Sequence, residues 1–294
     1  MKNFVILIQL FLFQFSLAAQ NILEKSLLWE ISGKGIHEKS YLFGTIHLIP
    51  KEDFFLPEKF EKAFESTSTL YLELDMNEMT DIGKMMGIME KCYMNNNKKL
   101  SDLLSEEEYS IVKEKMESMG LPMMLFERMK PLFISAMLSM ESSNPFEGSS
   151  ESTKSYELEF TQMANSKGKP VKGIETMEFQ LSIFDSIPYD VQAKSLVHSL
   201  KSEKNKADDS MDSLIKLYKS QDINKLMSVI ESSDEDMKPY MNLMLNNRNM
   251  SWIPIMEKAM IDKSCFFAVG AGHLGGEKGV IQLLRKQGFK VKAL

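Results

Sequence analysis

Two apolar runs near opposite ends of this 294-residue chain each end at a glycine that is followed three residues later by a histidine. The first run ends at Gly44 and leads to His47, and the second ends at Gly270 and leads to His273. A short apolar run bounded by a turn signal is typical of a buried strand, and a glycine allows the backbone to turn sharply at its end. Open α/β sheets bind ligands beyond the carboxyl ends of their strands. Because the chain has only four histidines, this repeated setting is its clearest functional indication.

Strands and helices alternate around both glycine turns, which favours an α/β fold. Around the first turn we expect a hairpin over 26–43, a helix over 56–64 and a strand over 69–75. Around the second we expect a strand over 265–269, a helix over 279–286 and a strand over 289–294. A helix over 156–165 and a strand over 171–176 lie between them, and long helical insertions are expected over about 77–140 and 177–260. The predicted fold is therefore α/β, with a central mixed sheet built from two strand–Gly-x-x-His–helix–strand units and a large inserted helical region.

The N-terminus has the three regions of a signal peptide, which we predict over residues 1–19. A short basic start is followed by an apolar stretch over 4–15 and then by the small residues of 16–19. The apolar stretch is shorter than the roughly 20 residues that a membrane span needs. Residues 20–294 are therefore expected to form an exported α/β domain, periplasmic or secreted, without a stable membrane anchor.

The charge and cysteine content limit the function classes further. A formal net charge of −6 argues against a nucleic-acid-binding protein, which normally carries a basic surface. Cys92 and Cys265 are the two cysteines, and an oxidising compartment would permit a disulfide between them. Two free buried thiols agree equally well with the sequence, and the oligomeric state is left open.

Two histidines and nearby carboxylates suggest a metal site. Glu73 and Glu175 lie at the ends of predicted strands, so they are expected near His47 and His273. Imidazole and carboxylate ligands suit Zn²⁺, Mn²⁺ or Co²⁺. A carboxylate outside the ligand set would serve as a general base. Alternatively, each histidine packs in the core on its own, or the glycine-rich turn over 270–276 cradles a phosphate, although it lacks the complete GxGxxG spacing.

Six short motifs in a fixed order span nearly the whole chain after the predicted signal peptide. They are Leu42-Phe-Gly-Thr-Ile-His47, Leu72-Glu-Leu-Asp75, Ser155-Tyr-Glu157, Lys172-Gly-Ile-Glu-Thr176 with Gln180, Arg248-Asn249 and Val269-Gly-Ala-Gly-His-Leu274. This ordered set resembles the TraB/GumN family, part of the wider TIKI-like superfamily.

The resemblance implies a compact α/β fold and, for the TIKI branch, metal-dependent proteolysis that uses both Gly-x-x-His motifs and an acidic residue. It implies that His47, Glu73 and His273 are metal ligands or catalytic groups. Arg248 would bind a substrate carboxylate or stabilise developing negative charge. Glu175 lies in the family's Gly-hydrophobic-Glu-Thr segment, and Glu157 stands where many relatives carry Asp.

The leading hypothesis is an exported metal-dependent hydrolase, a peptidase that uses Mn²⁺, Co²⁺ or Zn²⁺ and acts on a peptide or small-molecule substrate. One alternative is a metal-free esterase in which His47 activates water and Glu73 orients it. Another is a protein that binds haem or a polypeptide without catalysis. Both alternatives arise because the superfamily also includes erythromycin-esterase-like hydrolases and ChaN-like haem-binding proteins.

Overall fold

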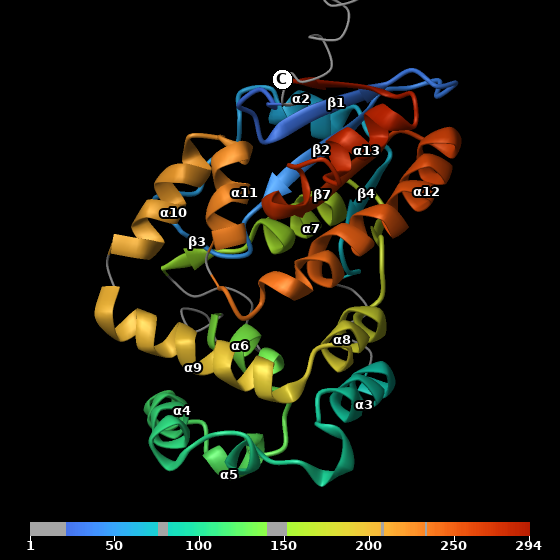
Figure 1. The fold of residues 1–294 in the computed structure, drawn as a ribbon. Helices are drawn as coiled ribbons and strands as arrows, with labels where there is room; N and C mark the ends of the chain where they lie inside the picture. Colours follow the sequence, from blue (N-terminus) through green and yellow to red (C-terminus); the bar gives the residue numbers. More distant parts are fainter. Residues whose placement is uncertain (1–21, 76–81, 140–151, 207–208, 233) are drawn as a thin grey trace, which may run out of the picture.

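The computed structural model describes residues 22–75, 82–139, 152–206, 209–232 and 234–294 (Figure 1). The predicted signal peptide over 1–19 lies outside these ranges. Within them, no helix combines the length and the apolar character that crossing a membrane would require.

A six-stranded mixed sheet forms the centre of the fold, in the order β6-β4-β7-β2-β1-β8. Its strands are β1 (Leu28–Ser32), β2 (Ser40–Thr45), β4 (Thr69–Leu72), β6 (Val171–Gly173), β7 (Cys265–Gly270) and β8 (Lys290–Ala293). Neighbours pair in parallel from β6 to β2, whereas β1 is antiparallel to both β2 and β8. A separate two-stranded sheet joins β3 (Ile49–Pro50) to β5 (Thr153–Lys154). The predicted α/β class with a mixed sheet is confirmed.

Both faces of the sheet are buried, and β2 and β7 contribute to the core on each face because their successive residues point to opposite sides. Phe43 and Phe266 enter one core, which they share with residues of α2 (Phe60–Glu65) and α7 (Tyr156–Ser166). Leu42 and Phe267 enter the other core, shared with α12 (Asn247–Asp262) and α13 (Val280–Lys286). The two central strands are therefore fixed by packing on both sides, which makes them a rigid base for the turns that follow them.

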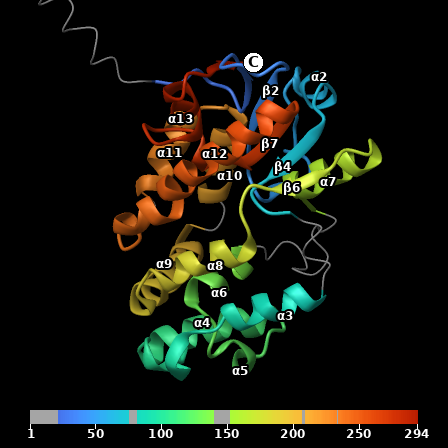
Figure 2. The same cartoon turned by 90° about the vertical axis from the view of Figure 1, so that its right-hand side faces the viewer.

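A group of helices lies apart from the sheet, below it in Figure 1 and again in Figure 2. These helices are α3 (Ile82–Lys91), α4 (Glu106–Ser118), α5 (Met123–Phe126), α6 (Pro131–Ser139), α8 (Met177–Asp185) and α9 (Tyr189–Lys206). They contribute two cores of their own. The chain then returns to the sheet through α10 (Asp209–Lys219) and α11 (Ile223–Ser232), and a π-helical segment (Asn242–Asn246) leads into α12.

Several element ends differ from the sequence-based expectation. α2 begins at Phe60 rather than at residue 56, because residues 57–59 form a turn. β4 ends at Leu72 and β6 ends at Gly173, so Glu73 and Glu175 follow their strands instead of lying within them. The two segments stay hydrogen-bonded beyond these ends, because Glu175 N–H donates to the carbonyl oxygen of Glu73 at 3.0 Å. They are also close, since a Cβ on Gly173 would lie only 2.8 Å from the backbone nitrogen of Asp75.

Two other sequence features have clear outcomes. Ser105 and Glu108 form a reciprocal capping box at the beginning of α4, which is the arrangement that a serine followed three residues later by a glutamate favours. Cys92 and Cys265 are free, buried thiols that belong to different cores. The structure therefore contains the free-thiol arrangement rather than the disulfide.

Candidate active site

The two glycine–histidine turns leave the same edge of the sheet. β2 and β7 are parallel neighbours, and Thr45 pairs with Gly270 at their ends. The turns also pack on each other, because a Cβ on Gly44 would lie 2.6 Å from Cδ1 of Leu274 and 3.2 Å from Cα of Ala271. Glycine at position 44 thus permits the second turn to approach the first, and any larger residue would push them apart.

His47 lies on the open side of the site and is paired with a carboxylate. Its Nδ1 is 3.3 Å from Oε1 of Glu157, and 77% of its side chain is exposed. Thr45 donates to Oε1 of Glu157 at 2.8 Å, and Ser155 donates to Oε2 at 3.0 Å, so the carboxylate is fixed in place. The hydrogen bond and the charge of Glu157 raise the pKa of His47 to about 9. His47 is therefore a cation at neutral pH.

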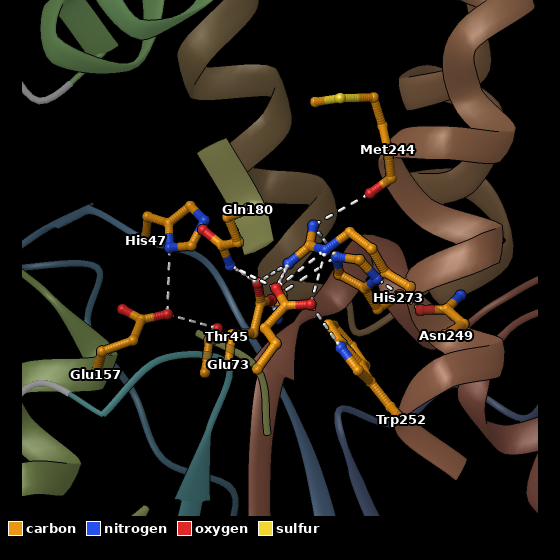
Figure 3. Close-up of polar contacts among 12 residues, drawn as sticks. Thr45, His47, Glu73, Glu157, Gln180, Met244, Asn249, Trp252 and His273 are labelled. Carbon is orange, nitrogen blue, oxygen red and sulfur yellow. Dashed lines mark hydrogen bonds and ion pairs between the residues drawn. The ribbon is translucent and has the colours of Figure 1, made fainter. Parts of the chain in front are cut away.

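Glu73 lies between the two histidines in Figure 3 and is held by donors on both oxygens. The backbone N–H of Gly270 donates to Oε1 at 2.8 Å, and Arg248 donates to Oε2 at 2.6 Å. Burial on its own would raise the pKa of Glu73, but the charges of His273, Arg248 and His47 and the Gly270 hydrogen bond lower it to about 2. His273 contributes only in the acidic range, where its own ring is protonated. Glu73 is therefore ionised at physiological pH.

His273 is buried, with 5% of its surface exposed, and its two ring nitrogens have different partners. Nε2 lies 3.2 Å from Nη1 of Arg248 and 3.8 Å from Oε1 of Glu73. Nδ1 lies 2.6 Å from Oδ1 of Asn249, and the ring packs against Trp252 at a centroid distance of 4.4 Å. Burial lowers the pKa of His273 to about 4, with Glu73 opposing the effect and Arg248 adding to it. This histidine is therefore neutral at pH 7.

Arg248 projects from α12 and uses each of its five N–H donors. Nε–H donates to Glu175, and Nη1 donates to the carbonyl oxygen of Met244 at 3.1 Å and faces Nε2 of His273. Nη2 donates to Glu73 and to Glu175. Burial opposes the charge of the guanidinium, but the two carboxylates outweigh it and raise the pKa of Arg248. Arg248 is thus the cation that joins the ends of β4, β6 and β7.

Glu175 contacts Arg248 and two further N–H donors. Trp252 Nε1 donates to its Oε2 at 2.8 Å, and Gln180 Nε2 donates to its Oε1 at 2.6 Å. The sequence suggests Glu175 as a metal ligand; in this structure its oxygens, like those of Glu73, accept from protein donors. Its observed contacts are those of a residue that holds Arg248.

The predicted residues therefore meet in part. Glu73, Arg248 and His273 form one buried cluster, and His47 lies at its open side with Glu157. Sequence reasoning gave no role to Asn249 or to Trp252. Trp252 stands four residues after Arg248, on the same face of a predicted helix, and Asn249 directly follows Arg248 in the Arg248-Asn249 motif. These positions are the signal that could have revealed them.

The donor types at this site suit a divalent ion, although the described ranges contain no ready-made group of three His, Cys, Asp or Glu side chains around one point. Glu73 Oε1 and His273 Nε2 are 3.8 Å apart, compared with about 3.4 Å for two ligands of a tetrahedral ion at 2.1 Å. Both imidazoles have a side-chain oxygen beside Nδ1, as metal-ligating histidines usually do, so Nε2 is the atom of each ring that would bind the ion. In this structure Nη1 of Arg248 faces Nε2 of His273.

Comparison with known proteins gives a consistent result. The model of the TraB/PrgY/gumN family matches residues 27–293. The chain is 26% identical over 322 residues to metalloprotease TIKI2 of Xenopus tropicalis, which covers 91% of this chain and 59% of that relative. It is 24% identical over 319 residues to metalloprotease TIKI1 of Homo sapiens, and this alignment covers 91% of this chain and 61% of that relative. The chain thus spans about three fifths of the length of these relatives. No solved structure is significantly similar to it.

Proposed function

The chain belongs to the TraB/PrgY/gumN family, and from this premise we propose that it is a metal-dependent hydrolase, specifically a peptidase. The observation that carries the proposal is the meeting of His273, Glu73 and Arg248 at the end of β7, with His47 from the neighbouring turn on the open side. The similarity to metalloproteases supports it. The proposed substrate is a peptide or another small molecule with a hydrolysable carbonyl group.

We assign His47, Glu73 and His273 as the residues that would hold Mn²⁺, Co²⁺ or Zn²⁺. A bound ion supplies a Lewis acid that polarises the scissile carbonyl and lowers the pKa of a water to about 7. Glu73 keeps a full negative charge because Gly270 and Arg248 donate to it. His273 is neutral at pH 7, which is the form that binds a metal, whereas His47 would have to release its proton as the ion binds.

Arg248 has a different part in this proposal. With an ion on Nε2 of His273, one Nη1–H of Arg248 would lose that partner, while its other donors keep theirs. The buried positive charge of Arg248 would stabilise negative charge that develops on the substrate oxygen. Glu175 keeps the guanidinium in place. His47 is the exposed member of the set, so a substrate would approach from its side.

The metal-free esterase is less well supported by the site. It requires His47 as a general base, but pairing with Glu157 raises the pKa of His47 to about 9 and keeps the ring protonated at neutral pH. Such a ring has no free electron pair with which to accept a proton from water.

Two finer assignments accompany the function. We interpret β2, α2 and β4 as one strand–Gly-x-x-His–helix–strand unit, and β7, α13 and β8 as the second, with helical insertions over about 77–140 and 177–260. The parallel pairing of β2 with β7 supports this interpretation. We also propose that the domain over 20–294 is exported, to the periplasm or outside the cell, after removal of residues 1–19.

The test of the function is metal binding together with turnover. Residues 20–294, stripped by a chelator, should bind close to one equivalent of Mn²⁺, Co²⁺ or Zn²⁺ in calorimetry and should then cleave members of a fluorogenic peptide library. His47→Ala and His273→Ala should lose both properties, whereas His37→Ala and His198→Ala, which change exposed histidines, should keep them. Full metal content and activity in both site variants would end the proposal. Turnover that survives complete chelation would favour the esterase, and a haem absorption band without turnover would favour a binding protein.

A further inference from the structure

Asn249 is a buried polar residue between Arg248 and the second histidine turn. It follows Arg248 on α12, and only 1% of its surface is exposed. Its Nδ2 donates to the carbonyl oxygen of Lys278 at 2.9 Å. Its Oδ1 lies 2.6 Å from Nδ1 of His273 (Figure 3). Asn249 thus joins the segment before α13 to the imidazole.

These two contacts determine which way the amide points. An asparagine side chain has one oxygen that accepts and one NH₂ group that donates. The carbonyl of Lys278 only accepts, so the NH₂ group must face it and the oxygen must face His273. Because that oxygen cannot donate, Nδ1 of His273 must carry the hydrogen.

The other side of the ring requires the same assignment. Arg248 has only donors, and its Nη1 lies 3.2 Å from Nε2 of His273. An imidazole with a hydrogen on Nε2 would place two donors against each other without an acceptor. Nε2 therefore holds a lone pair, and both contacts of His273 indicate a neutral ring that is protonated at Nδ1.

We propose that Asn249 is a positioning residue that fixes this tautomer and so presents the Nε2 lone pair of His273 to the site. The tautomer follows from hydrogen bonding alone. The further step, in which the lone pair binds a metal ion, rests on the proposed function. A partner of this kind on the remote nitrogen of a ligating histidine typically changes metal affinity 10–100-fold.

The experiment is nitrogen NMR of residues 20–294 labelled with ¹⁵N-histidine and kept free of metal. The four histidine signals are assigned from single His→Gln variants. In the unchanged chain, His273 should show one protonated nitrogen at Nδ1. Asn249→Leu keeps the size of the side chain and removes the acceptor at Nδ1, so only the contact with Arg248 still favours Nδ1–H. The Nε2–H form, which would face Oε1 of Glu73 at 3.8 Å, should then appear beside it. Asn249→Asp, which keeps an acceptor, should restore Nδ1–H. Asn247→Leu, at an exposed position two residues away on α12, is the matched control and should change nothing.

Metal titration of the same samples separates this proposal from the proposed function. If Zn²⁺ binds, its affinity should fall about 10–100-fold in Asn249→Leu and should not change in Asn247→Leu. A tautomer that responds to Asn249 in a protein that binds no metal would uphold the positioning role and overturn the metal-dependent function. An Nε2–H tautomer in the unchanged chain would overturn the positioning role without reference to any variant. An unchanged Nδ1–H signal in a folded Asn249→Leu protein would also overturn it.

Discussion

The two Gly-x-x-His turns have the same spacing and leave neighbouring parallel strands, but their histidines have opposite electrostatic properties. His47 is largely exposed, is paired with a carboxylate and has a pKa raised to about 9. His273 is buried, is paired with an amide and has a pKa lowered to about 4. The motif itself therefore sets only the position of the ring. The partner of Nδ1 and the access of water set its charge.

This difference separates the site into two parts. The buried part consists of His273, Glu73, Glu175 and Arg248, where two carboxylates share one cation. The open part consists of His47 and Glu157. Changes in the buried part should mainly cost stability, because an unpaired charge there is not solvated. Changes in the open part should mainly shift protonation, because water screens the pair.

The largest expected effect comes from Arg248→Met. Removal of this cation leaves Glu73 and Glu175 without their shared partner, so the free energy of unfolding should fall by about 3–5 kcal/mol. Urea denaturation of both proteins at pH 7 measures this loss of unfolding free energy. The matched control is Arg128→Met, which removes an exposed guanidinium and should change stability by less than about 0.5 kcal/mol. Equal effects of the two substitutions would mean that Arg248 does not organise the buried part.

The next effect concerns the contact between the two turns. In Gly44→Ala the new Cβ would overlap Leu274 and press on the backbone of Ala271, which should reduce the free energy of unfolding by about 1–3 kcal/mol. Gly87→Ala in α3 is the control, because its Cβ would meet no atom within 4 Å and should stabilise the helix by about 0.5–1 kcal/mol. Tolerance of alanine at position 44 would show that the turns are not in tight contact.

A smaller effect is expected from Glu157→Gln. Loss of the hydrogen bond and charge should return the pKa of His47 from about 9 towards its ordinary value of 6.5, as followed by NMR titration. The pKa of His47 is raised in the folded state, so the pair stabilises the fold fully below pH 6.5 and loses its contribution as pH rises through 9. The stability difference between the two proteins should shrink over that window and stay below about 1 kcal/mol, since the ring is exposed.

Glu159→Gln, on the same helix, is the control for this titration and should leave the pKa of His47 unchanged. A pKa near 6.5 for His47 in the unchanged chain would remove the contrast between the turns. The pKa of His273 is lowered instead of raised, so its effect on stability runs in the opposite direction with pH. Its neutral form is favoured in the folded state, so this group costs stability as pH falls from 6.5 through 4.

The sequence predicts the parts of the site that depend on local pattern. Apolar runs that end at Gly44 and Gly270 correctly indicated buried strands, and parallel pairing brought their turns together. Pattern does not reveal a partner that comes from a distant segment. Glu175 meets Arg248 across 73 residues, and His47 meets Glu157 across 110. The pairing of Glu175 with Arg248 is for this reason visible only in the structure, and its role as a metal ligand stays a prediction.

The central claim is that both turns contribute to one metal site, and paramagnetic Mn²⁺ tests it directly. Substoichiometric Mn²⁺ is added to ¹⁵N-histidine-labelled protein over residues 20–294, and the loss of each histidine signal is followed. His47 and His273 should broaden together, while the exposed His37 and His198 stay sharp. If only one of the two site histidines broadened, or neither did, the turns would not share an ion and the account would be contradicted.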